Sequence, residues 1–379
     1  MTRMSTRISL PLAGLMGLTM LAAVGCTQED ADPSADPVAS TGMSPFSIAA
    51  TVSDASVDDV AIMLAEFIDE VDDTTRGVPA DWLVAGASNL TEEQDVAEAV
   101  LNLPGGSKVI EVCNHLYAEQ AMSFGGQHGV ALPCEVAVVP NGDDVDVVLL
   151  NPEAIFGLFF HDVPAEYAAQ MGGLADTVRS ELEELVEDGL AGTSSQFPRE
   201  NVGPVWSEDD LAQFRSMDHS IEMDLDIPAA YVSQDDGPTE FKAAFVEQLL
   251  ERLTFEGAET VGSSVPGLTA DDWRSARPYA LGLPGNVSVV EICSPTYASA
   301  AMSTGEHHAP ALPCQISVWP EGDTLRIHVL DPNYIFPVFF SDAPAEMMDQ
   351  MGGLASAVQQ DIVKMVEAAR TDILASQPE

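Results

Sequence analysis

The sequence predicts an α+β domain that occurs twice in tandem, and two observations support this. Three stretches recur at an offset of 180 residues: VIEVC at 109–113 as VVEIC at 289–293, ALPC at 131–134 and at 311–314, and QMGGLA at 170–175 and at 350–355. A period this long gives each copy enough residues for its own core, which indicates a duplicated domain rather than a solenoid. Within each copy, strand patterns stand between helical patterns, as when helices cover one face of an antiparallel sheet.

The first part of each copy reads as a strand followed by a helix. In the first copy the strand pattern covers Phe46–Ser53, and an amphipathic helix pattern covers Val57–Val71. In the second copy we expect the strand at Ile227–Ser233, because both segments contain Ala-Ala-x-Val-Ser. Residues 72–102 and 257–282 are the least alike, and we interpret them as variable connections.

The repeated block that comes next alternates strands with short helices. It begins with a buried strand at Ser107–Cys113 and a short helix at Tyr117–Met122. Two further strands, Cys134–Val139 and Asp144–Leu150, are joined by Pro-Asn-Gly-Asp, which is typical of a tight hairpin. An apolar run from Ile155 to Phe160 then leads into a closing helix with one apolar face.

Each closing helix contains two adjacent glycines, Gly172-Gly173 and Gly352-Gly353. A glycine inside a helix costs about 1 kcal/mol relative to alanine. We therefore expect a helix break or a close backbone approach at both places.

These patterns divide the chain into six segments. We predict a signal peptide at 1–26, a flexible tether at 27–45, a first repeat domain at 46–187, a linker at 188–226, a second repeat domain at 227–371 and a C-terminal tail at 372–379.

The N-terminus has the pattern of a secretory signal followed by a lipid attachment site. Arg3 and Arg7 precede an apolar run from Ile8 to Val24, and Gly25-Cys26 follows it. The segment LAAVGC at 21–26 resembles a bacterial lipobox, although leucine usually stands where this chain has alanine at position 23. The resemblance implies a lipid anchor on Cys26 and a protein of the cell envelope that faces the periplasm. Threonine at position 27 favours the outer membrane over the inner membrane. The alternative is an ordinary signal peptide with an incidental cysteine.

The chain is strongly acidic, with 14 basic and 61 acidic residues and a net charge of −47. Phosphate contacts need clustered Lys and Arg, so nucleic acid is excluded as a partner. We interpret the acidity as a solvated surface adapted to high salt, where screening weakens the repulsion. A calcium-binding surface is the alternative, but the sequence contains no D-x-[DN]-x-[DN]-G loop.

The repeated block resembles the bacterial family called domain of unknown function 302. The resemblance rests on a strand that ends in Cys113-Asn114, a short Tyr-Ala-x-x-Ala helix from Tyr117, and Leu-Pro before the strand at Cys134. The family's usual Cys-Asn-Pro is Cys-Asn-His in the first copy and Cys-Ser-Pro in the second, which argues against a strict catalytic tripeptide. The resemblance implies a TATA-box-binding-protein-like fold in β-α-β-β-β-α order, with the two copies paired as a pseudo-dimer within the chain.

Signatures of the common enzyme classes are absent from the sequence. It contains no G-x-S-x-G, no G-x-x-x-x-G-K-[ST], no H-E-x-x-H and no C-x-x-C. We therefore name no catalytic residue and expect a non-enzymatic protein.

Both copies retain cysteines, a histidine and a methionine at matching positions. The retained residues are Cys113 and Cys134, Cys293 and Cys314, His128 and His308, and Met122 and Met302. In an oxidising compartment each cysteine pair predicts either a disulfide, which contributes roughly 3 kcal/mol, or a pair of ligands. Cys, His and Met together suit Cu(I), so copper is the cofactor we would expect at such a site. His307 has Gln127 as its counterpart and is not included.

This set supports three functional hypotheses. The first is an envelope lipoprotein that binds a soft metal or a redox-active ligand at the Cys/His end of each domain. It requires a ring nitrogen of His128 and of His308 to lie close to the cysteine sulfurs of the same domain. The second is a structural or interaction lipoprotein with two intradomain disulfides and no ligand. The third is a thiol–disulfide oxidoreductase that cycles the Cys113–Cys134 pair.

Overall fold

The computed structural model describes residues 42–70, 82–85, 88–89, 92–93, 100–132, 134–255, 263–275, 280–312 and 314–376. All of them belong to one unit that runs from Thr41 to Glu379. The predicted signal peptide, Cys26 and most of the tether lie outside the described residues. Within the described part of the chain, no helix is long and apolar enough to cross a membrane.

The first repeat is built on an eight-stranded sheet in which all strand pairs are antiparallel. The order is β10-β1-β8-β7-β6-β2, with β9 also on β1 and β5 also on β6. The strands are β1 (Phe46–Val52), β2 (Trp82–Val84), β5 (Leu101–Asn102), β6 (Lys108–Asn114), β7 (Cys134–Asn141), β8 (Asp144–Leu150), β9 (Ser195–Gln196) and β10 (Glu200–Val202). A separate small ladder joins β3 (Ser88–Asn89) to β4 (Glu92–Glu93).

The second repeat has its own eight-stranded sheet, in the order β11-β18-β17-β16-β14-β13, with β12 also on β18 and β15 also on β16. The strands are β11 (Ser220–Glu222), β12 (Leu225–Asp226), β13 (Thr254–Phe255), β14 (Arg274–Ser275), β15 (Leu281–Leu283), β16 (Val287–Cys293), β17 (Cys314–Glu321) and β18 (Thr324–Leu330). The predicted hairpins are confirmed in both sheets, since Gly142 and Gly322 take φ values of 65° and 64° in the tight turns.

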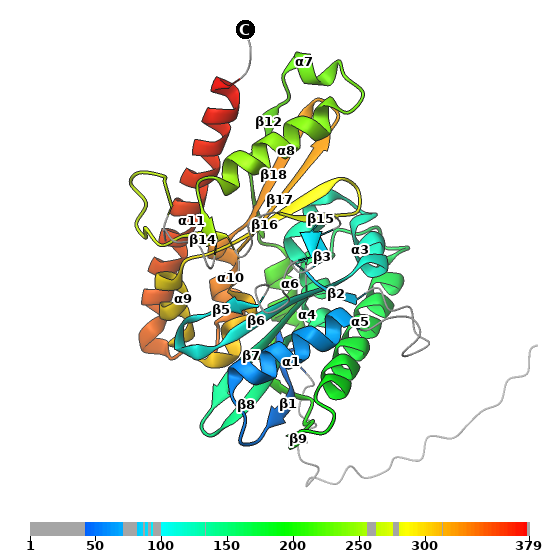
Figure 1. The fold of residues 1–379 in the computed structure, drawn as a ribbon, viewed down its shortest axis with the longest axis vertical. Helices are drawn as coiled ribbons and strands as arrows, with labels where there is room; N and C mark the ends of the chain where they lie inside the picture. The colour runs from blue at the N-terminus through cyan, green and yellow to red at the C-terminus, as the bar shows by residue number, and fades with distance from the viewer. Residues whose placement is uncertain are drawn as a thin grey trace, which may run out of the picture. The chain divides into compact units, whose positions relative to one another are not determined.

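Helices cover the sheets of both repeats (Figure 1). In the first repeat they are α1 (Val57–Glu70), η2 (Pro104–Gly106), α3 (His115–Met122), η3 (Gly126–Ala131), α4 (Pro152–Phe159) and α5 (Ala168–Gly189). The connection contains α6 (Glu208–Arg215). The second repeat contains α7 (Ala229–Val232), α8 (Gly237–Leu250), α9 (Pro295–Met302), η4 (Glu306–Ala311), α10 (Pro332–Phe339) and α11 (Ala345–Ala375). The α+β class and the tandem arrangement predicted from the sequence are therefore confirmed.

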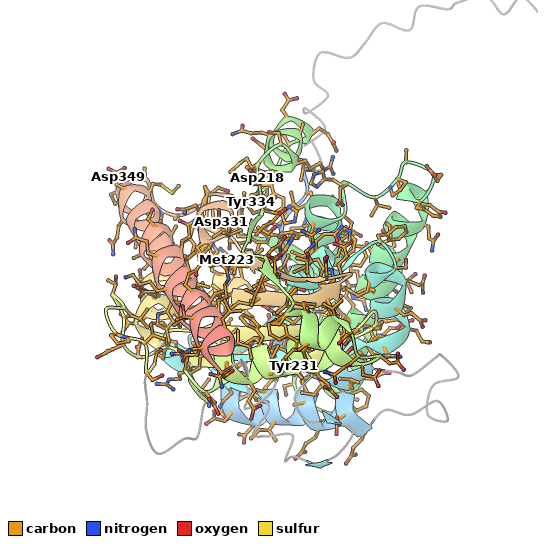
Figure 2. The ribbon with its side chains drawn as sticks, turned by 90° about the horizontal axis from the view of Figure 1, so that it is seen from above. Asp218, Met223, Tyr231, Asp331, Tyr334 and Asp349 are labelled. Carbon is orange, nitrogen blue, oxygen red and sulfur yellow. The ribbon has the colours of Figure 1, made fainter. Side chains whose placement is uncertain are left out.

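Local sequence explains where α10 begins. Asp331 is its N-cap and accepts a hydrogen bond from the backbone nitrogen of Asn333 at 2.9 Å. Pro332 stands at the first helical position, where its missing N–H has no cost. Tyr334, which is 1 % exposed, follows within the first turn (Figure 2). The cap thus fixes the point at which the chain turns from β18 into the core.

The strand predicted at Ile227–Ser233 is wrong, because that segment contains the helix α7. Strands β11 and β12 pair with β18 instead, and Asp226 already lies opposite Thr324, the first residue of β18. No length of β18 is then left to pair with residues 229–233. Residues 188–226, predicted as a linker, supply short strands to both sheets.

The double glycines produce neither a helix break nor a close approach. The helices α5 and α11 run through Gly172-Gly173 and Gly352-Gly353 without interruption. A Cβ atom added at any of these four positions would meet no atom within 4 Å. The glycines therefore leave open space beside both helices.

The two repeats pack through a reciprocal exchange of short segments. The η3 segment of the first repeat lies on β16, β17 and β18, and η4 of the second lies on β6, β7 and β8. The approach is close, because a Cβ at Gly126 would lie 2.3 Å from the ring of Trp319 and one at Gly129 would lie 2.4 Å from Ser317 Oγ. One buried hydrophobic cluster accordingly contains residues of both repeats.

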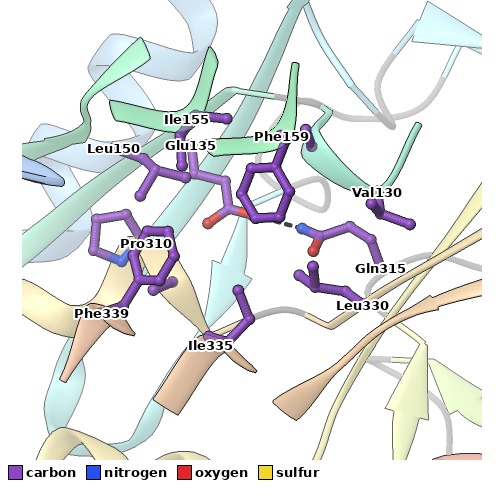
Figure 3. A pocket seen from close by; sticks show the side chains of 12 residues that line it. Val130, Glu135, Leu150, Ile155, Phe159, Pro310, Gln315, Leu330, Ile335 and Phe339 are labelled. Atoms are coloured by element: carbon purple, nitrogen blue, oxygen red, sulfur yellow. Dashed lines mark hydrogen bonds between the residues drawn. The ribbon is translucent and has the colours of Figure 1, made fainter. Parts of the chain in front are cut away.

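Equivalent residues of the two repeats meet at the centre of this packing. Gln315 Nε2 donates to Glu135 Oε1 at 2.9 Å, and the two positions are 180 residues apart. They line a cavity of about 30 Å³ (Figure 3), enough for a water molecule. The lining consists of six equivalent pairs: Val130 and Pro310, Ala131 and Ala311, Glu135 and Gln315, Leu150 and Leu330, Ile155 and Ile335, and Phe159 and Phe339. Such pairing is typical of the axis of a two-fold dimer.

Replacing Glu135 by Gln should raise stability at pH 8 and leave it nearly unchanged at pH 4. Burial, followed by the charge of Glu291, raises the pKa of the Glu135 carboxyl well above its ordinary value. The folded chain therefore holds this proton more tightly than the unfolded chain. The resulting stability is complete below the unfolded pKa of about 4.3 and is lost as pH rises toward the folded pKa, at up to about 1.4 kcal/mol per pH unit.

Urea unfolding of both proteins at pH 4 and pH 8 measures this difference. The matched control is Glu247→Gln at an exposed position on α8, which should change stability little at either pH. An equal effect of Glu135→Gln at both pH values would show that the fold does not raise the pKa of this carboxyl.

Candidate functional site

The four predicted cysteines lie at the ends of central strands as free thiols. The predicted Cys113–Cys134 and Cys293–Cys314 disulfides are therefore not formed. The ladders pair Val112 with Cys134 and Ile292 with Cys314. Cys113 and Cys293 therefore lie one residue beyond these pairs and are not directly opposite their intended partners. The two cysteines of the second repeat nevertheless line the same pocket. Cys113 and Cys293 are buried in the cluster shared by the repeats. Cys134 packs against that same cluster, and Cys314 packs against the cluster beneath α8 and α11.

The environment of three of these thiols, those of Cys113, Cys134 and Cys314, keeps them protonated. Burial and then the charge of Glu291 raise the pKa of Cys113 to about 12. Burial and then the charge of Glu135 raise the pKa of Cys314 to about 12, and burial also raises that of Cys134. The thiolate is the form that binds metals and attacks disulfides. These cysteines are consequently poor candidates for either chemistry.

The structure does not bring the predicted histidines to the cysteines. His128 donates from Nδ1 to the carbonyl of Phe159 at 3.0 Å, and its Nε2 lies 3.2 Å from Gln127 Nε2. His308 Nδ1 lies 2.8 Å from Thr304 Oγ1, and its Nε2 lies 2.9 Å from Asp342 Oδ1. All four ring nitrogens are thus engaged by groups other than cysteine.

The predicted methionines lie in the core. Met122 and Met302 are each 6 % exposed and belong to the cluster shared by the repeats. They fill apolar space there.

A tyrosine at matching positions in the two repeats anchors each closing helix, α5 or α11. In each repeat a tyrosine hydroxyl and a tryptophan indole donate to one carboxylate: Tyr117 and Trp82 to Glu181 of α5, and Tyr297 and Trp273 to Asp361 of α11. The two carboxylates are 180 residues apart, but the two tryptophans are not, so the repeat offset does not reveal this match. In the first repeat these hydrogen bonds hold α5, α3 and the edge strand β2 together. In the second they join α11 and α9 to Trp273, which directly precedes β14.

One group of side chains in the described residues has the spacing of metal ligands: His307, His308 and Asp342. Their donor atoms all lie within 4.8 Å of one another. His307 Nε2 lies 2.9 Å from Asp342 Oδ2, and His308 Nε2 lies 2.9 Å from Asp342 Oδ1. His308 is fully buried, whereas His307 and Asp342 are 21 % and 27 % exposed. The group therefore has a buried side and a side open to solvent.

Glycines make room for the exposed ring. A Cβ added at Gly305 would lie 2.5 Å from His307 Cε1, and one at Gly203 would lie 2.9 Å from His307 Cδ2. Gly203 has a φ of 80°, which strongly favours glycine. Two segments that are far apart in the sequence, one after β10 and one just before His307, thus shape the space around the His307 ring.

Aromatic rings hold the buried imidazole. The ring of Phe340 lies 4.3 Å from that of His308, and Phe46 meets His308 edge-on at 5.7 Å. Phe46 is the first residue of β1 and so comes from the other repeat. The site therefore depends on the packing between repeats.

Proton positions at His308 follow from its partners. The Thr304 hydroxyl donates its proton to the carbonyl of Ala301 at 2.7 Å, so it must accept from His308 Nδ1. In a neutral ring Nε2 is then an acceptor, yet it faces the acceptor Asp342 Oδ1. Either a second proton or a cation must lie between these two atoms. Burial lowers the pKa of His308, although the hydrogen bond to Asp342 opposes this shift.

The Asp342 carboxylate is suited to bind a positively charged group. Burial alone would raise the pKa of Asp342, but hydrogen bonds from His307 and His308 hold it well below its usual range. Two imidazoles and one carboxylate are ligands for zinc and related divalent ions, and three protein ligands leave a coordination position open.

The first repeat shows the same site with one residue changed. Gln127, His128 and Asp162 occupy the positions of His307, His308 and Asp342. Because His128 Nδ1 donates to a carbonyl, its Nε2 accepts, and the Gln127 amide supplies the proton at 3.2 Å. His128 Nε2 lies 3.6 Å from Asp162 Oδ1. The amide thus satisfies the ring without a cation.

Sequence reasoning missed His307 and Asp342. It set His307 aside because the first copy has Gln127 there, although it is this residue that completes the group. The available signal was Asp162 and Asp342, an aspartate retained at the repeat offset.

Comparison with known proteins agrees with the duplicated architecture. The family described as "Domain of unknown function DUF302" matches residues 88–188 and 280–369, together just over half of the chain. The chain belongs to the DUF302 family. The two matched regions confirm the tandem pair of DUF302 domains.

Two solved structures are similar to this DUF302 chain. A crystal structure of an uncharacterized conserved DUF302 protein from Bacillus stearothermophilus shares 15 % identity, with 37 % of this chain and 93 % of that chain covered and a TM-score of 0.25. DynU16, described as a putative protein in the dynemicin biosynthetic locus, shares 12 % identity, with coverage of 87 % and 99 % and a TM-score of 0.22. The search of curated proteins found no match.

The four core thiols should be intact but unreactive in the folded protein. Because burial raises the pKa of Cys113 and Cys314 to about 12, alkylation at pH 7 should be slow until denaturant is added, after which all four should react. Mass spectrometry after alkylation without reductant counts them. Peptides joined as Cys113–Cys134 or Cys293–Cys314 would contradict the free-thiol state.

Proposed function

We propose that the protein is a non-enzymatic binding protein for a divalent transition-metal ion, held by His307, His308 and Asp342. The observation that supports this is the convergence of three donor atoms within 4.8 Å, with Nε2 of both rings directed at one carboxylate. The acceptor-to-acceptor contact at His308 adds to it, because a bound cation satisfies both atoms.

The donor set favours zinc over the Cu(I) expected from the sequence. Imidazole nitrogen and carboxylate oxygen suit borderline ions such as Zn²⁺ and Co²⁺, whereas Cu(I) prefers thiolate and thioether sulfur. The Thr304 hydroxyl at His308 Nδ1 fixes the ring orientation, as the outer partner of a metal-bound histidine commonly does. The net charge of −47 further favours cations near the surface at low salt.

Replacing His307 by Gln should abolish tight Zn²⁺ binding, because it gives the second repeat the residues of the first. Loss of outer-sphere partners alone costs about 10–100-fold in metal affinity, so loss of a ligand should cost at least about 100-fold. Calorimetry with Zn²⁺ and the absorption spectrum of the Co²⁺-loaded protein measure this. An affinity unchanged by His307→Gln would contradict the site.

The matched variant is Gln127→His, which gives the first repeat the residues of the second. We expect the number of Zn²⁺ ions bound per chain to rise from one to two. Wild-type protein that binds no Zn²⁺ would leave the group as a structural hydrogen-bond network and overturn the proposal.

We also propose that the chain is an envelope lipoprotein anchored through Cys26 and facing the periplasm. The lipobox-like segment at 21–26 and the polar tether after it support this proposal. In a Gram-negative host, wild-type protein should incorporate an alkyne-labelled fatty acid and fractionate with the outer membrane, whereas Cys26→Ala should lose the label. Labelling that persists in Cys26→Ala, or that is absent from the wild type, would exclude a lipid on this residue.

A further inference from the structure

A cavity of the first repeat lies beside α4, α5 and the end of α6. Its volume is about 590 Å³, within the range of small-molecule sites. Phe156, Phe160, Val163 and Met171 form much of its apolar wall. None of the three proposed metal ligands lines this cavity, so a ligand bound here is independent of the proposed metal function.

One cation at this cavity has no carboxylate partner among the residues that the structure describes. Arg215, the last residue of α6, donates from Nε to the carbonyl of Gly157 at 2.7 Å. No carboxylate of the described residues lies within ion-pair distance of its guanidinium, whereas Arg179 and Arg326 each pair with two acids. In a chain with 61 acidic residues, this leaves Arg215 available to an external anion.

Two glycines line the cavity near this cation. A Cβ at Gly157 would lie 3.5 Å from Arg215 Nη2 and 3.7 Å from Met43 Sδ, which are ordinary contact distances, so the guanidinium lies directly beside α4. Gly172 lines the opposite helix α5, and a Cβ there would meet no atom within 4 Å. Glycine is a poor helix former, and at position 172 its effect is to leave the cavity open.

The other polar groups limit the ligand to a single negative charge. Glu153 also lines the cavity, but Arg179 neutralises it at 2.9 Å. Asp176 is exposed and negatively charged. His161 donates from Nδ1 to the carbonyl of Leu158 at 2.7 Å, so its Nε2 is an acceptor in the neutral ring. A dianion would meet one cation and the negative charge of Asp176.

We propose that this cavity binds an amphipathic monocarboxylate, a medium-chain fatty acid, with its carboxylate on Arg215. The hydrocarbon chain packs on Phe156, Phe160 and Met171 and crosses the open surface at Gly172. The guanidinium nitrogens not used by Gly157 supply the charged hydrogen bonds to the carboxylate.

Calorimetric titration with sodium dodecanoate below its micelle concentration tests the assignment. We expect saturable binding at one site per chain. Arg215→Gln should weaken it at least about tenfold, because a hydrogen bond between charged groups is lost. Dodecanol, which has the same chain and no charge, should bind at least about tenfold more weakly than dodecanoate.

A second pair of variants keeps the test independent of Arg215. Gly172→Leu projects into the cavity and should block dodecanoate, while its better helix propensity keeps the protein folded. Gly173→Leu carries the same helix benefit at a neighbouring exposed position that does not line the cavity, and it should bind as the wild type does. Absent binding to wild type, equal binding by Arg215→Gln, or equal binding by Gly172→Leu would overturn the proposal. Zn²⁺ affinity should be the same in all three variants as in the wild type, since the sites are separate.

Discussion

The structure depends on how polar groups are buried where the two repeats meet. Glu111, its counterpart Glu291 and Glu135 are each at most 3 % exposed. The counterpart of Glu135 in the second repeat is Gln315. An isolated carboxylate cannot remain charged in such a place without a large desolvation cost, so the acid is kept neutral or hydrogen-bonded. The hydrogen bond from Gln315 to Glu135 meets this constraint for one pair. The apolar residues around it then close the interface, with η3 and η4 each lying on the other repeat's sheet.

Duplication let the two copies diverge around this shared core. The segments before β7 and before β17 each form a short 3-10 helix over equivalent residues, yet one presents Gln127 and the other His307 to an equivalent histidine and aspartate. The two copies also differ in the space beside the closing helices. The double glycine occurs in both helices, but Arg215 contacts α4 of the first repeat. Each copy can therefore acquire a different ligand chemistry while the residues that pack the core stay alike.

Hydrophobic periodicity and the repeat offset were enough to predict the class, the hairpins and the closing helices, because these depend on local pattern. The strand at Ser220–Glu222 was not predictable in this way, since it depends on how much of β18 remains to be paired. The state of the cysteines was not predictable from their spacing, because the strand register, which places Val112 rather than Cys113 opposite Cys134, is set only when the strands pair. His307 and Asp342 come from η4 and the turn after α10, and only tertiary packing brings their atoms together.

The central hydrogen bond has a consequence for how such a protein can evolve. In a homodimer, position 135 would face its own copy, so the axis would hold either two acids or two amides. Two acids must share a proton there, and two amides carry no titratable group. Fusing the copies into one chain gives each side of the axis its own codon, so that Glu135 can face Gln315. A covalent tandem can therefore contain a mixed acid–amide contact at its axis, whereas a symmetric pair of identical chains cannot.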